Sequence, residues 1–430
     1  MAFYTLGCKV NQQETNSMRL LFERAGYKTV PFEEKADVYV VNTCTVTHVS
    51  DKKSRQHISR AHANNPEAII AVVGCYAQNK PEEVGQMPGV SLVIGTQHRE
   101  QIVELVEQAM SQNVVEDIQK AKTFEALPVA LNVERTRVQV KIQDGCDRYC
   151  AYCIIPYVRG PVRSCPLSDV QKTLAHLSEQ NVGELVLTGI HLMSYGKDLP
   201  GNQTLAGVIK AAAGLPGIGR VRLGSLEPAL VDDSFVETLK EIPSNKLCEQ
   251  FHLSLQSGSA CVLKRMGRRY TTVQYKEAVE RLRGAFPNCA ITTDVIAGFP
   301  GETLEEHNEC KAFLKEIGFA RIHVFPYSRR EGTCAAEMKG QLSKQIKQLR
   351  AKELILLGAD MEAQFLRAQI GTNHLLLVEE RGEGMCEGYT GNYCRVRAQY
   401  KGENVELLPV RIVGVEGETL IGECIGQNKI

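Results

Sequence analysis

The stretch VQVKIQDGCDRYCAYCIIP, residues 138–156, decides the fold of this chain. It opens with Val138–Ile142, a short valine-rich run that has the length and apolar character of a buried strand. Three cysteines follow within eight residues, and thiolates this close in sequence can converge on one metal centre at the end of a strand. The three are Cys146, Cys150 and Cys153.

The spacing of these cysteines narrows the kind of metal centre. A single C-x-x-C pair is typical of a redox couple or of half a zinc site. A complete structural zinc site needs a second such pair, which this sequence lacks. Three cysteines with no nearby fourth favour an iron–sulfur cluster that leaves one iron open to another ligand. Three buried structural cysteines are the alternative interpretation.

Five further strand-sized runs follow the cysteine stretch, with helical segments between them. The runs lie at 184–187, 220–223, 251–255, 291–296 and 321–325. Strands that alternate with helices pair in parallel, so six such units predict an α/β fold with a central, partial (β/α)6 barrel. The chemistry of such barrels lies at the carboxyl ends of the strands, where the cysteines also lie.

Two other regions flank the predicted barrel. Residues 1–112 also alternate short strands with helices, which predicts a Rossmann-like α/β domain. After a long helix near 343–369 the sequence changes to short β-rich runs with glycine turns, which predicts a small β-barrel. The predicted domains are 1–112, 132–364 and 366–430, with a linker between the first two.

The composition limits the class of protein. The chain has 430 residues, 43% of them hydrophobic, which is enough to bury the cores of two or three domains. No apolar run approaches the roughly 18 residues of a membrane helix, and the first residues lack the pattern of a secretory signal. Fifty basic residues cancel fifty acidic ones, so nucleic acid would bind only at local patches. Fifteen cysteines in a reducing cytoplasm favour metal ligands, thiol chemistry or packing over disulfides.

A second set of cysteines follows the strands of the first region. Cys8, Cys44 and Cys75 each come just after one of its first three predicted strands. Because the carboxyl ends of parallel strands meet at one edge of a sheet, we expect the three thiols to lie together. Chance placement at three strand ends is the alternative. The polar neighbours expected to hydrogen-bond to the sulfur atoms are Asn11, Asn42 and Thr43.

Polar residues and glycines follow the later strands of the barrel. They are candidates for a cofactor cradle, because glycine lets the backbone approach a ligand and Glu227 and Gln256 offer hydrogen bonds to an amine or a ribose. Ordinary turn chemistry is the alternative. The candidate cofactor-binding residues are Thr188, Gly189, Ser225, Glu227, Gln256, Ser257 and Gly298.

The C-x-x-x-C-x-x-C spacing after the first strand of a parallel barrel resembles the radical S-adenosylmethionine (radical SAM) enzymes. The resemblance implies that the three cysteines hold a 4Fe–4S cluster whose open iron binds S-adenosylmethionine. It also implies that Tyr152, between the last two cysteines, lies against the adenine of that cofactor.

Over nearly its whole length the chain resembles one branch of that superfamily, the methylthiotransferases. LGCKVN at 6–11, NTCTVT at 42–47 and VGC at 73–75 resemble the three cysteine motifs of the family's N-terminal domain. The resemblance implies a second 4Fe–4S cluster on the cysteines of these motifs, which carries the sulfur to be donated. The terminal β-module resembles a TRAM domain, a barrel that contacts RNA.

The first two motifs resemble the MtaB type of the family. This resemblance implies an enzyme that adds a methylthio group to C2 of N6-threonylcarbamoyladenosine next to the anticodon of a tRNA, with S-adenosylmethionine as both methyl donor and radical source. It also implies a cytoplasmic monomer served by an electron donor such as flavodoxin or ferredoxin, with no catalytic residue beyond the cluster ligands. Three alternatives stay open: N6-isopentenyladenosine in tRNA as the substrate, an aspartate of a ribosomal protein as the substrate, or a Cys–metal RNA-binding protein without enzymatic activity.

Basic residues near the barrel mouth, together with an aromatic and cationic face on the terminal module, are the candidate RNA contacts. They are Arg159, Arg163, Arg268, Arg269, Tyr393, Arg395 and Arg397. The nine cysteines outside the two motif sets show no ligand-like spacing, and we expect them to be buried packing residues.

Overall fold

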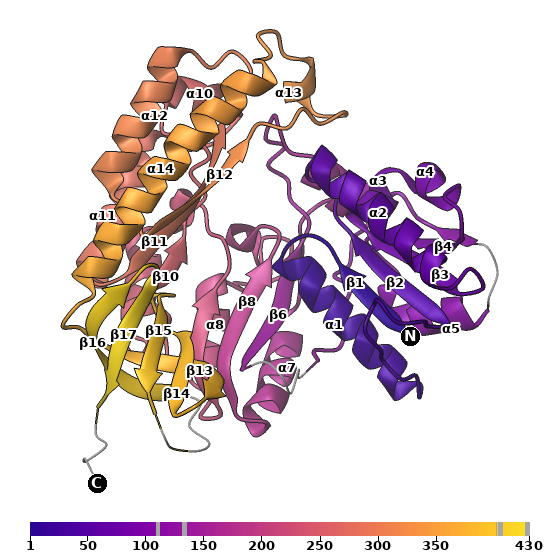
Figure 1. Ribbon diagram of the computed structural model, residues 1–430, viewed down its shortest axis with the longest axis horizontal. Coiled ribbons are helices and arrows are strands. Elements are labelled where there is room, and N and C mark those ends of the chain that lie inside the picture. The colour runs from indigo at the N-terminus through magenta and orange to yellow at the C-terminus, as the bar shows by residue number, and fades with distance from the viewer. Residues whose placement is uncertain (109–111, 131–135, 401, 403–406, 426–430) are drawn as a thin grey trace.

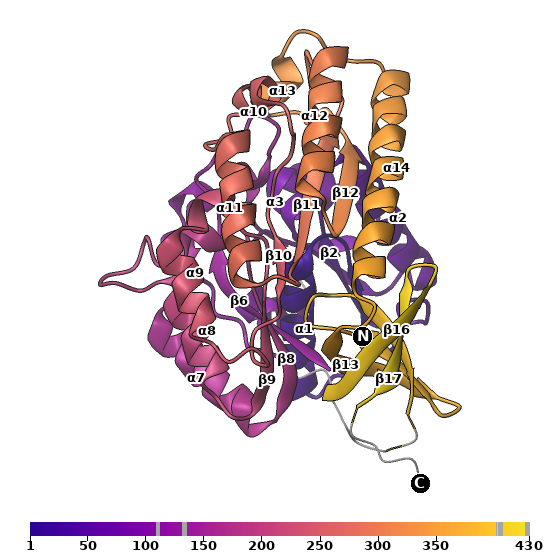
Figure 2. The same ribbon diagram turned by 90° about the vertical axis from the view of Figure 1, so that its left-hand side faces the viewer.

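The structure, a computed structural model, describes residues 1–108, 112–130, 136–400, 402 and 407–425. Figures 1 and 2 show an N-terminal α/β domain, a central domain of strands with long helices, and a small C-terminal barrel. Both outer domains pack on the central one. The predicted boundary at residue 132 and the end of the chain at residue 430 lie outside the described residues.

Five parallel strands form the sheet of the N-terminal domain and follow one another in chain order. They are β1 (Ala2–Thr5), β2 (Val38–Thr43), β3 (Ile69–Gly74), β4 (Val90–Ile94) and β5 (Gln112–Val114). Helices α1 (Lys9–Arg24) and α5 (Ile102–Glu107) cover one face, and α2 (His48–Asn64) and α4 (Pro81–Gly85) cover the other. Burial on both faces explains why the central strands are continuous apolar runs, whereas β5 is short and polar, so that no such run predicts it.

Six parallel strands form the incomplete barrel of the central domain, which confirms the predicted (β/α)6 arrangement. They are β6 (Arg137–Asp144), β8 (Val182–Gly189), β9 (Ile218–Leu223), β10 (Gln250–His252), β11 (Ala290–Ala297) and β12 (Arg321–Pro326). Strands β6, β8 and β9 pair in one sheet and β10 to β12 in another. Single bridges from Val221 to Leu247 and from Leu226 to Leu253 join the two sheets, so all six carboxyl ends share one rim.

Helices cover the outside of this barrel and share one hydrophobic core with its strands (Figure 2). The long ones are α7 (Leu167–Glu179), α8 (Leu205–Ala213), α9 (Asp233–Lys240), α11 (Thr272–Ala285), α12 (Leu304–Ile317) and α14 (Lys344–Ala368). The short elements α10 (Ala260–Arg265) and α13 (Cys334–Glu337) lie near the rim, and β7 (Arg163–Ser164) pairs with the end of β6. Within the described ranges, no helix combines the length and apolar character that crossing a bilayer requires.

The C-terminal module is a closed five-stranded barrel, as the β-rich runs predict. Its strands are β13 (Asn373–Gly382), β14 (Met385–Tyr389), β15 (Arg395–Gln399), β16 (Leu407–Glu416) and β17 (Thr419–Cys424). Alternate residues such as Leu376, Val396 and Val410 fill its interior.

A buried carboxylate fixes this barrel to the central domain. Glu184, on β8, accepts hydrogen bonds from Arg220 at 2.7 Å and Arg222 at 2.6 Å, and Arg137 lies 3.0 Å away. Burial alone would raise the pKa of Glu184, but Arg222, Arg220 and Arg137 hold it well below its ordinary value. The remaining donors of Arg220 and Arg222 reach barrel carbonyl groups, among them that of Leu375 at 2.8 Å, so the acid aims the two arginines across the interface.

Replacing this acid tests how the barrel is attached. Glu184→Gln leaves two buried arginines, Arg220 and Arg222, without their carboxylate. We therefore expect it to lower the free energy of unfolding by about 3–5 kcal/mol in urea unfolding followed by circular dichroism. The matched control is Glu237→Gln, which removes an exposed pair with Lys240 and should cost less than about 1 kcal/mol. Equal effects of the two substitutions would contradict this account of the interface.

Candidate active site between two cysteine triads

The first triad lies on the loop after β6. Gly145, at a φ of 73°, turns the chain where a Cβ atom would collide with the backbone of Pro161. The amide of Cys146 then donates to the carbonyl of Gly160 at 3.0 Å, and that of Cys153 donates to the carbonyl of Cys150 at 2.9 Å. These bonds fold the loop back on itself, and α6 (Ile155–Arg159) follows directly. We call Cys146, Cys150 and Cys153 the radical triad.

Two thiols of the radical triad, those of Cys146 and Cys153, are poor acids without a metal. Burial raises the pKa of Cys146 to about 11 and that of Cys153 to about 12. Ligand cysteines must be deprotonated, so bound iron has to supply the positive charge that stabilises them. In the described part of the chain no three Cys, His, Asp or Glu side chains are placed to hold a single metal ion. Three thiols without a fourth fit a cluster in which each takes a separate iron.

The candidate cradle residues lie at the carboxyl ends of four neighbouring strands, β8 to β11. Thr188 and Gly189 end β8, and Thr188 and Ser257 are buried, whereas Ser225 is exposed. Gln256 and Gly298 both adopt a positive φ, 69° and 74°. A non-glycine residue in that region is strained, and hydrogen bonds to neighbouring β11 hold Gln256 there.

Glu227, which follows β9, is the electrostatic centre of this rim. Its carboxylate lies 2.9 Å from both Arg148 and Arg268 and 3.3 Å from His191. Burial raises the pKa of Glu227, but the hydrogen bond with His191 and the charges of Arg268 and Arg148 outweigh it and lower the pKa to about 2. Arg268 also donates to the Sγ atom of Cys150 at 3.3 Å, so the charge reaches the radical triad.

The second triad lies at the sheet edge of the N-terminal domain, where the strand pattern places it. Cys8 precedes α1, Cys44 directly follows β2, and Cys75 begins α3 (Cys75–Asn79) after β3. A Cβ atom on Gly7 would lie 3.2 Å from that of Cys44, so the first two loops touch. The pKa of Cys75 is raised to about 12, chiefly by burial; Arg159 opposes the rise, and the nearby charges of Cys44 and Cys8 add to it. We call Cys8, Cys44 and Cys75 the auxiliary triad.

Asn11 ties the auxiliary triad together. Its side-chain amide donates to the carbonyl of Leu6 at 2.9 Å and to that of Thr43 at 3.0 Å, while its oxygen accepts from Cys8 at 3.5 Å. Asn42 instead bonds to the backbone of Asn11, and Thr43 to that of β3. Of the three polar neighbours expected to contact sulfur, only Asn11 does so among the described residues.

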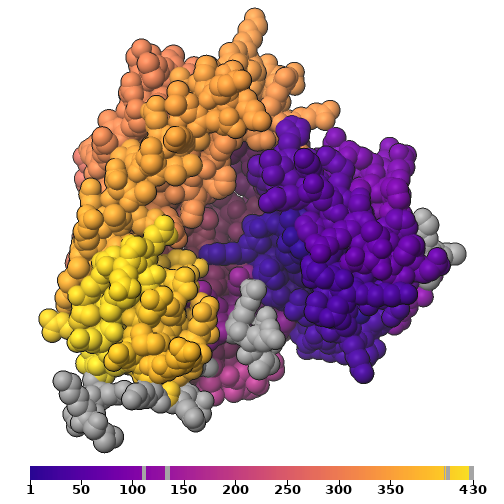
Figure 3. All heavy atoms as spheres, in the orientation of Figure 1, coloured from indigo at the N-terminus to yellow at the C-terminus, as the bar shows by residue number. Residues whose placement is uncertain are grey.

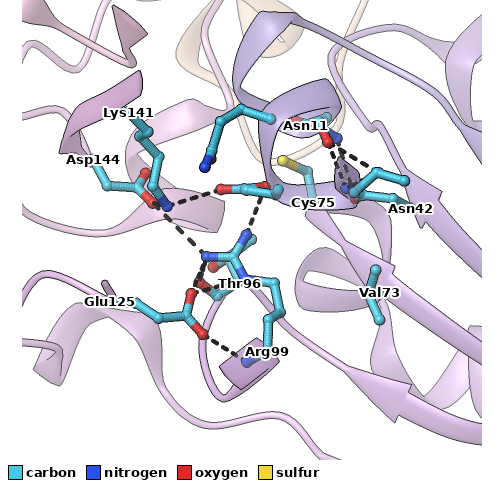
Figure 4. A network of polar contacts seen from close by, with 12 residues as sticks. Asn11, Asn42, Val73, Cys75, Thr96, Arg99, Glu125, Lys141 and Asp144 are labelled. Atoms are coloured by element: carbon cyan, nitrogen blue, oxygen red, sulfur yellow. Dashed lines mark hydrogen bonds and ion pairs between the residues drawn. The ribbon is translucent and has the colours of Figure 1, made fainter. Parts of the chain in front are cut away.

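A buried charge network lies beside Cys75 of the auxiliary triad (Figure 4). Glu14, on α1, is fully buried and lies 2.6 Å from Arg99, 2.6 Å from Arg159 and 3.1 Å from Lys141. The pKa of Glu14 falls well below its ordinary value, because Arg159, Arg99 and Lys141 outweigh its desolvation. Asp144 accepts from Lys141 at 3.1 Å and from Arg159 at 3.3 Å.

This network carries an excess of positive charge beside the auxiliary triad. Within the described residues, four cations (Arg99, Lys141, Arg159 and Arg163) surround three acids (Glu14, Glu125 and Asp144), which leaves a net charge of +1. The Nε atom of Arg159 donates to the Sγ atom of Cys75 at 3.3 Å. A metal-bound thiolate at Cys75 would therefore supply the missing negative charge.

This network is not among the features predicted from the sequence, although the sequence holds one signal of it. Glu14 interrupts an apolar stripe of α1 formed by Val10, Met18 and Phe22, which are all buried. A carboxylate on the buried face of a helix needs a charged partner from elsewhere in the fold.

The candidate RNA contacts divide by burial. Arg159, Arg163 and Arg268 are not surface residues: their guanidinium groups are buried in ion pairs and backbone hydrogen bonds, which corrects the expectation that they meet phosphates. Arg269 is exposed. On the C-terminal barrel, Arg395 and Arg397 both pair with Glu387 at 2.5 Å. Tyr393 stacks on Tyr389, with ring centroids 4.9 Å apart, beside Arg137 and Arg222.

The nine other cysteines also divide by burial. Cys165, Cys248, Cys289, Cys310, Cys386 and Cys394 are buried, as expected of packing residues. Cys424 is half-buried, and Cys261 and Cys334 are exposed, so the expectation is wrong for these two. Both lie on the short helices α10 and α13, and it is their neighbours Val262 and Ala335 that enter the small core there.

Comparison with known proteins agrees with this geometry. Residues 1–95 match the family described as "Uncharacterized protein family UPF0004", and residues 140–314 match the Radical SAM superfamily. The chain is 42% identical over 406 residues to the threonylcarbamoyladenosine tRNA methylthiotransferase MtaB of Bacillus subtilis, covering 92% of this chain and 89% of that protein. The chain belongs to the radical SAM methylthiotransferases of the MtaB type.

Other similarities support the same placement of this methylthiotransferase. The Aquifex aeolicus protein of the same name is 37% identical, covering 90% of this chain and 95% of that one. A tRNA-2-methylthio-N(6)-dimethylallyladenosine synthase of Natranaerobius thermophilus is 33% identical, covering 99% and 97%. The fold also matches the radical S-adenosylmethionine methyltransferase TsrM of Kitasatospora setae, solved with cobalamin and a 4Fe–4S cluster, at a TM-score of 0.54 and 14% identity, covering 90% of this chain and 80% of that one.

The pKa of Glu227 predicts how this rim responds to acid. Its folded value of about 2 lies below the ordinary 4.5, so the ionised carboxylate stabilises the fold above pH 4.5 and that contribution is lost as the pH falls toward 2. We expect the unfolding free energy of the native chain relative to Glu227→Gln to shrink by about 1 kcal/mol between pH 7 and pH 4. Urea titrations of both proteins at the two pH values measure this free-energy difference. A difference that does not change with pH would refute the lowered pKa of Glu227.

Proposed function

We propose that this methylthiotransferase adds a methylthio group to C2 of N6-threonylcarbamoyladenosine next to the anticodon of a tRNA. In this proposal the radical triad holds a 4Fe–4S cluster that binds S-adenosylmethionine, and the auxiliary triad holds a second 4Fe–4S cluster that carries the sulfur. The names of the relatives at 42% and 37% identity support the substrate, and the two donor sets support the clusters.

One observation carries the proposal: the two triads lie on adjoining elements of different domains. Cys75 of the auxiliary triad packs against Ile154 and Val158, which directly follow the radical triad in the chain. Forming a carbon–sulfur bond at one adenine carbon requires a radical source and a sulfur source around the same base. Two unrelated metal sites would not need this proximity.

The chain's own residues hold and shield this centre. When bound, the two clusters and S-adenosylmethionine supply the one-electron chemistry and the sulfur that replacing an aromatic C–H bond requires. The six cysteines bind the irons, Glu227 keeps Arg148 and Arg268 at the rim, and Gln256 and Gly298 bring backbone toward the cofactor. Tyr152, Thr188, Gly189, Ser225 and Ser257 are the further proposed cofactor contacts.

The surroundings of Lys9 favour threonylcarbamoyladenosine over isopentenyladenosine. Lys9 follows Cys8, is accessible to solvent, and forms no hydrogen bond or ion pair within the described part of the chain. Although Lys9 is accessible to solvent, the protein around it partly desolvates its ammonium group and lowers its pKa. The charges of Arg222 and Arg137 lower the pKa further, and that of Glu184 opposes them. A threonylcarbamoyl group ends in a carboxylate, which the ammonium group of Lys9 would attract. An isopentenyl group is an uncharged hydrocarbon and would gain nothing from this charge.

A hollow between the three domains offers room for RNA (Figure 3). We propose that Arg269, Tyr393, Arg395 and Arg397 contact RNA, and that the closed barrel acts as a TRAM domain. Arg159, Arg163 and Arg268 are not part of this proposal, because their guanidinium groups are buried. The proposal includes a cytoplasmic monomer and an electron donor such as flavodoxin or ferredoxin.

The modified nucleoside itself tests the proposed reaction. We expect mass spectrometry of tRNA digests to show N6-threonylcarbamoyladenosine without its 2-methylthio form in a strain that lacks this protein, because C2 is then never attacked. The unsubstituted gene should restore the product, and genes carrying Cys75→Ala or Cys150→Ala should not. If the strain instead lost 2-methylthio-isopentenyladenosine, the substrate would be N6-isopentenyladenosine and not N6-threonylcarbamoyladenosine.

Iron analysis tests the two clusters separately from the substrate. Anaerobically reconstituted protein should hold about eight irons per chain, and about four when either complete triad is replaced by alanine. Cys310→Ala, which removes a buried cysteine outside both triads, is the control and should keep about eight. About four irons in the unsubstituted chain would refute the second cluster.

Lys9 gives a prediction about the substrate alone. We expect Lys9→Met to raise KM for tRNA bearing threonylcarbamoyladenosine by about tenfold or more, since a charged hydrogen bond to its carboxylate is lost, while kcat changes less. Lys9→Arg keeps the charge and should stay close to the unsubstituted enzyme. Single-turnover and steady-state kinetics on modified anticodon stem-loops measure both, and an unchanged KM for Lys9→Met would remove Lys9 from the substrate site.

A further inference from the structure

Each cysteine triad receives one arginine hydrogen bond at its sulfur. Arg159 donates from Nε to the Sγ atom of Cys75 at 3.3 Å, and Arg268 donates from Nη1 to the Sγ atom of Cys150 at 3.3 Å. Both arginines belong to the central domain, but one serves the auxiliary triad of the N-terminal domain.

Buried neighbours fix the direction of each arginine. Arg159 is fully buried, donates to Glu14 at 2.6 and 3.0 Å, and donates to Asn11 at 2.9 Å. The Asn11 oxygen that accepts from Arg159 also accepts from the thiol of Cys8, a bond that Cys8 loses when it binds iron as a thiolate, so Arg159 acts on the auxiliary triad through Cys75.

The second arginine is held in the same way by different groups. Arg268 lies 2.9 Å from Glu227, donates to the hydroxyl of Tyr270 at 3.0 Å, and places its guanidinium 4.8 Å from the centre of that ring. A bidentate or stacked guanidinium is a rigid donor, so neither arginine is free to turn away from its sulfur.

A positive N–H donor at a cluster sulfur changes the chemistry of the cluster. Reduction adds negative charge to the iron–sulfur core, and a nearby cation with its hydrogen bond stabilises that charge, which makes the reduction potential less negative. The burial of both arginines strengthens the effect, because little water is present to screen it.

We propose that Arg159 and Arg268 are positioning residues, and that each sets the orientation and reduction potential of one cluster independently of the other. This inference rests on the proposed function, in which both triads hold clusters. It assigns to Arg159 a role in the sulfur-bearing centre and to Arg268 the matching role in the centre that binds S-adenosylmethionine.

The test is a redox titration of the two clusters, followed by electron paramagnetic resonance, on the full reconstituted chain. Signals are assigned with two parent variants, one with the radical triad and one with the auxiliary triad replaced by alanine. Arg159→Gln should shift only the cluster on the auxiliary triad to a more negative potential, by roughly 59 mV, equivalent to a tenfold change in its reduced-to-oxidised ratio. Arg268→Gln should shift only the cluster on the radical triad, in the same direction.

Two further variants serve as a control and as a substitute in this test. Arg269→Gln removes the exposed neighbour of Arg268 and should shift neither potential. Arg159→Gln leaves Arg99 at 2.6 Å and Lys141 at 3.1 Å from Glu14, so this buried carboxylate keeps two cationic partners. If that variant nevertheless loses its cluster, Arg159→Lys replaces it: a lysine keeps the charge but cannot bond Glu14, Asn11 and Cys75 together, so a smaller shift in the same direction is expected.

The outcomes separate this inference from the proposed function. About eight irons per chain with both potentials unchanged in the glutamine variants would overturn the inference alone, as would a shift of both clusters by either variant. About four irons in the unsubstituted chain would overturn the two-cluster proposal and the inference with it.

Discussion

Buried carboxylates attach the N-terminal domain to the central one: Asp51 pairs with Arg330, and a larger network centres on the carboxylate of Glu14. Glu14 stands on α1 of the N-terminal domain, while Lys141 and Arg159, two of the three cations that neutralise it, belong to the central domain. Glu14 has Arg99 as a partner in its own domain, whereas in the described part of the central domain Lys141, Arg159 and Arg163 share Asp144. Buried cations that outnumber their acids are strongly unfavourable, so the central domain needs Glu14. Docking the domains completes the ion pairs and in the same step brings Cys75 against the helix that follows the radical triad.

The C-terminal barrel is attached on the same principle. Glu184 gathers Arg137, Arg220 and Arg222 in the central domain, and two of these arginines bond to carbonyl groups of the barrel. Glu14 and Glu184 both stand at buried positions that an apolar residue would normally occupy. Each acid holds several cations together at a domain boundary. Such networks add little net stability compared with apolar packing, but they allow only one relative orientation of the parts.

The sequence predicts the large features of this molecule because they depend on local patterns. Apolar runs of strand length locate ten of the parallel strands, and the positions of Cys8, Cys44 and Cys75 after three of them predict their convergence. The roles of Arg159 and Arg268 are not predictable in this way. Both stand in basic runs that resemble a phosphate-binding surface, and only the fold shows that Glu14, 145 residues before Arg159, buries one of them. Short polar strands such as β5 are not predicted either, because they carry no apolar pattern.

The short helix α6 has a consequence for how such chains recombine. It carries Ile155 at one end and Arg159 at the other, so it joins the radical triad to the partner of Glu14 within a single turn or so of helix. A foreign N-terminal domain grafted onto this barrel would function only if it brought an acid to the place of Glu14 and an amide to the place of Asn11. The two halves are therefore expected to have been inherited as a unit, and chimeras between distant relatives should be built by exchanging the C-terminal barrel instead.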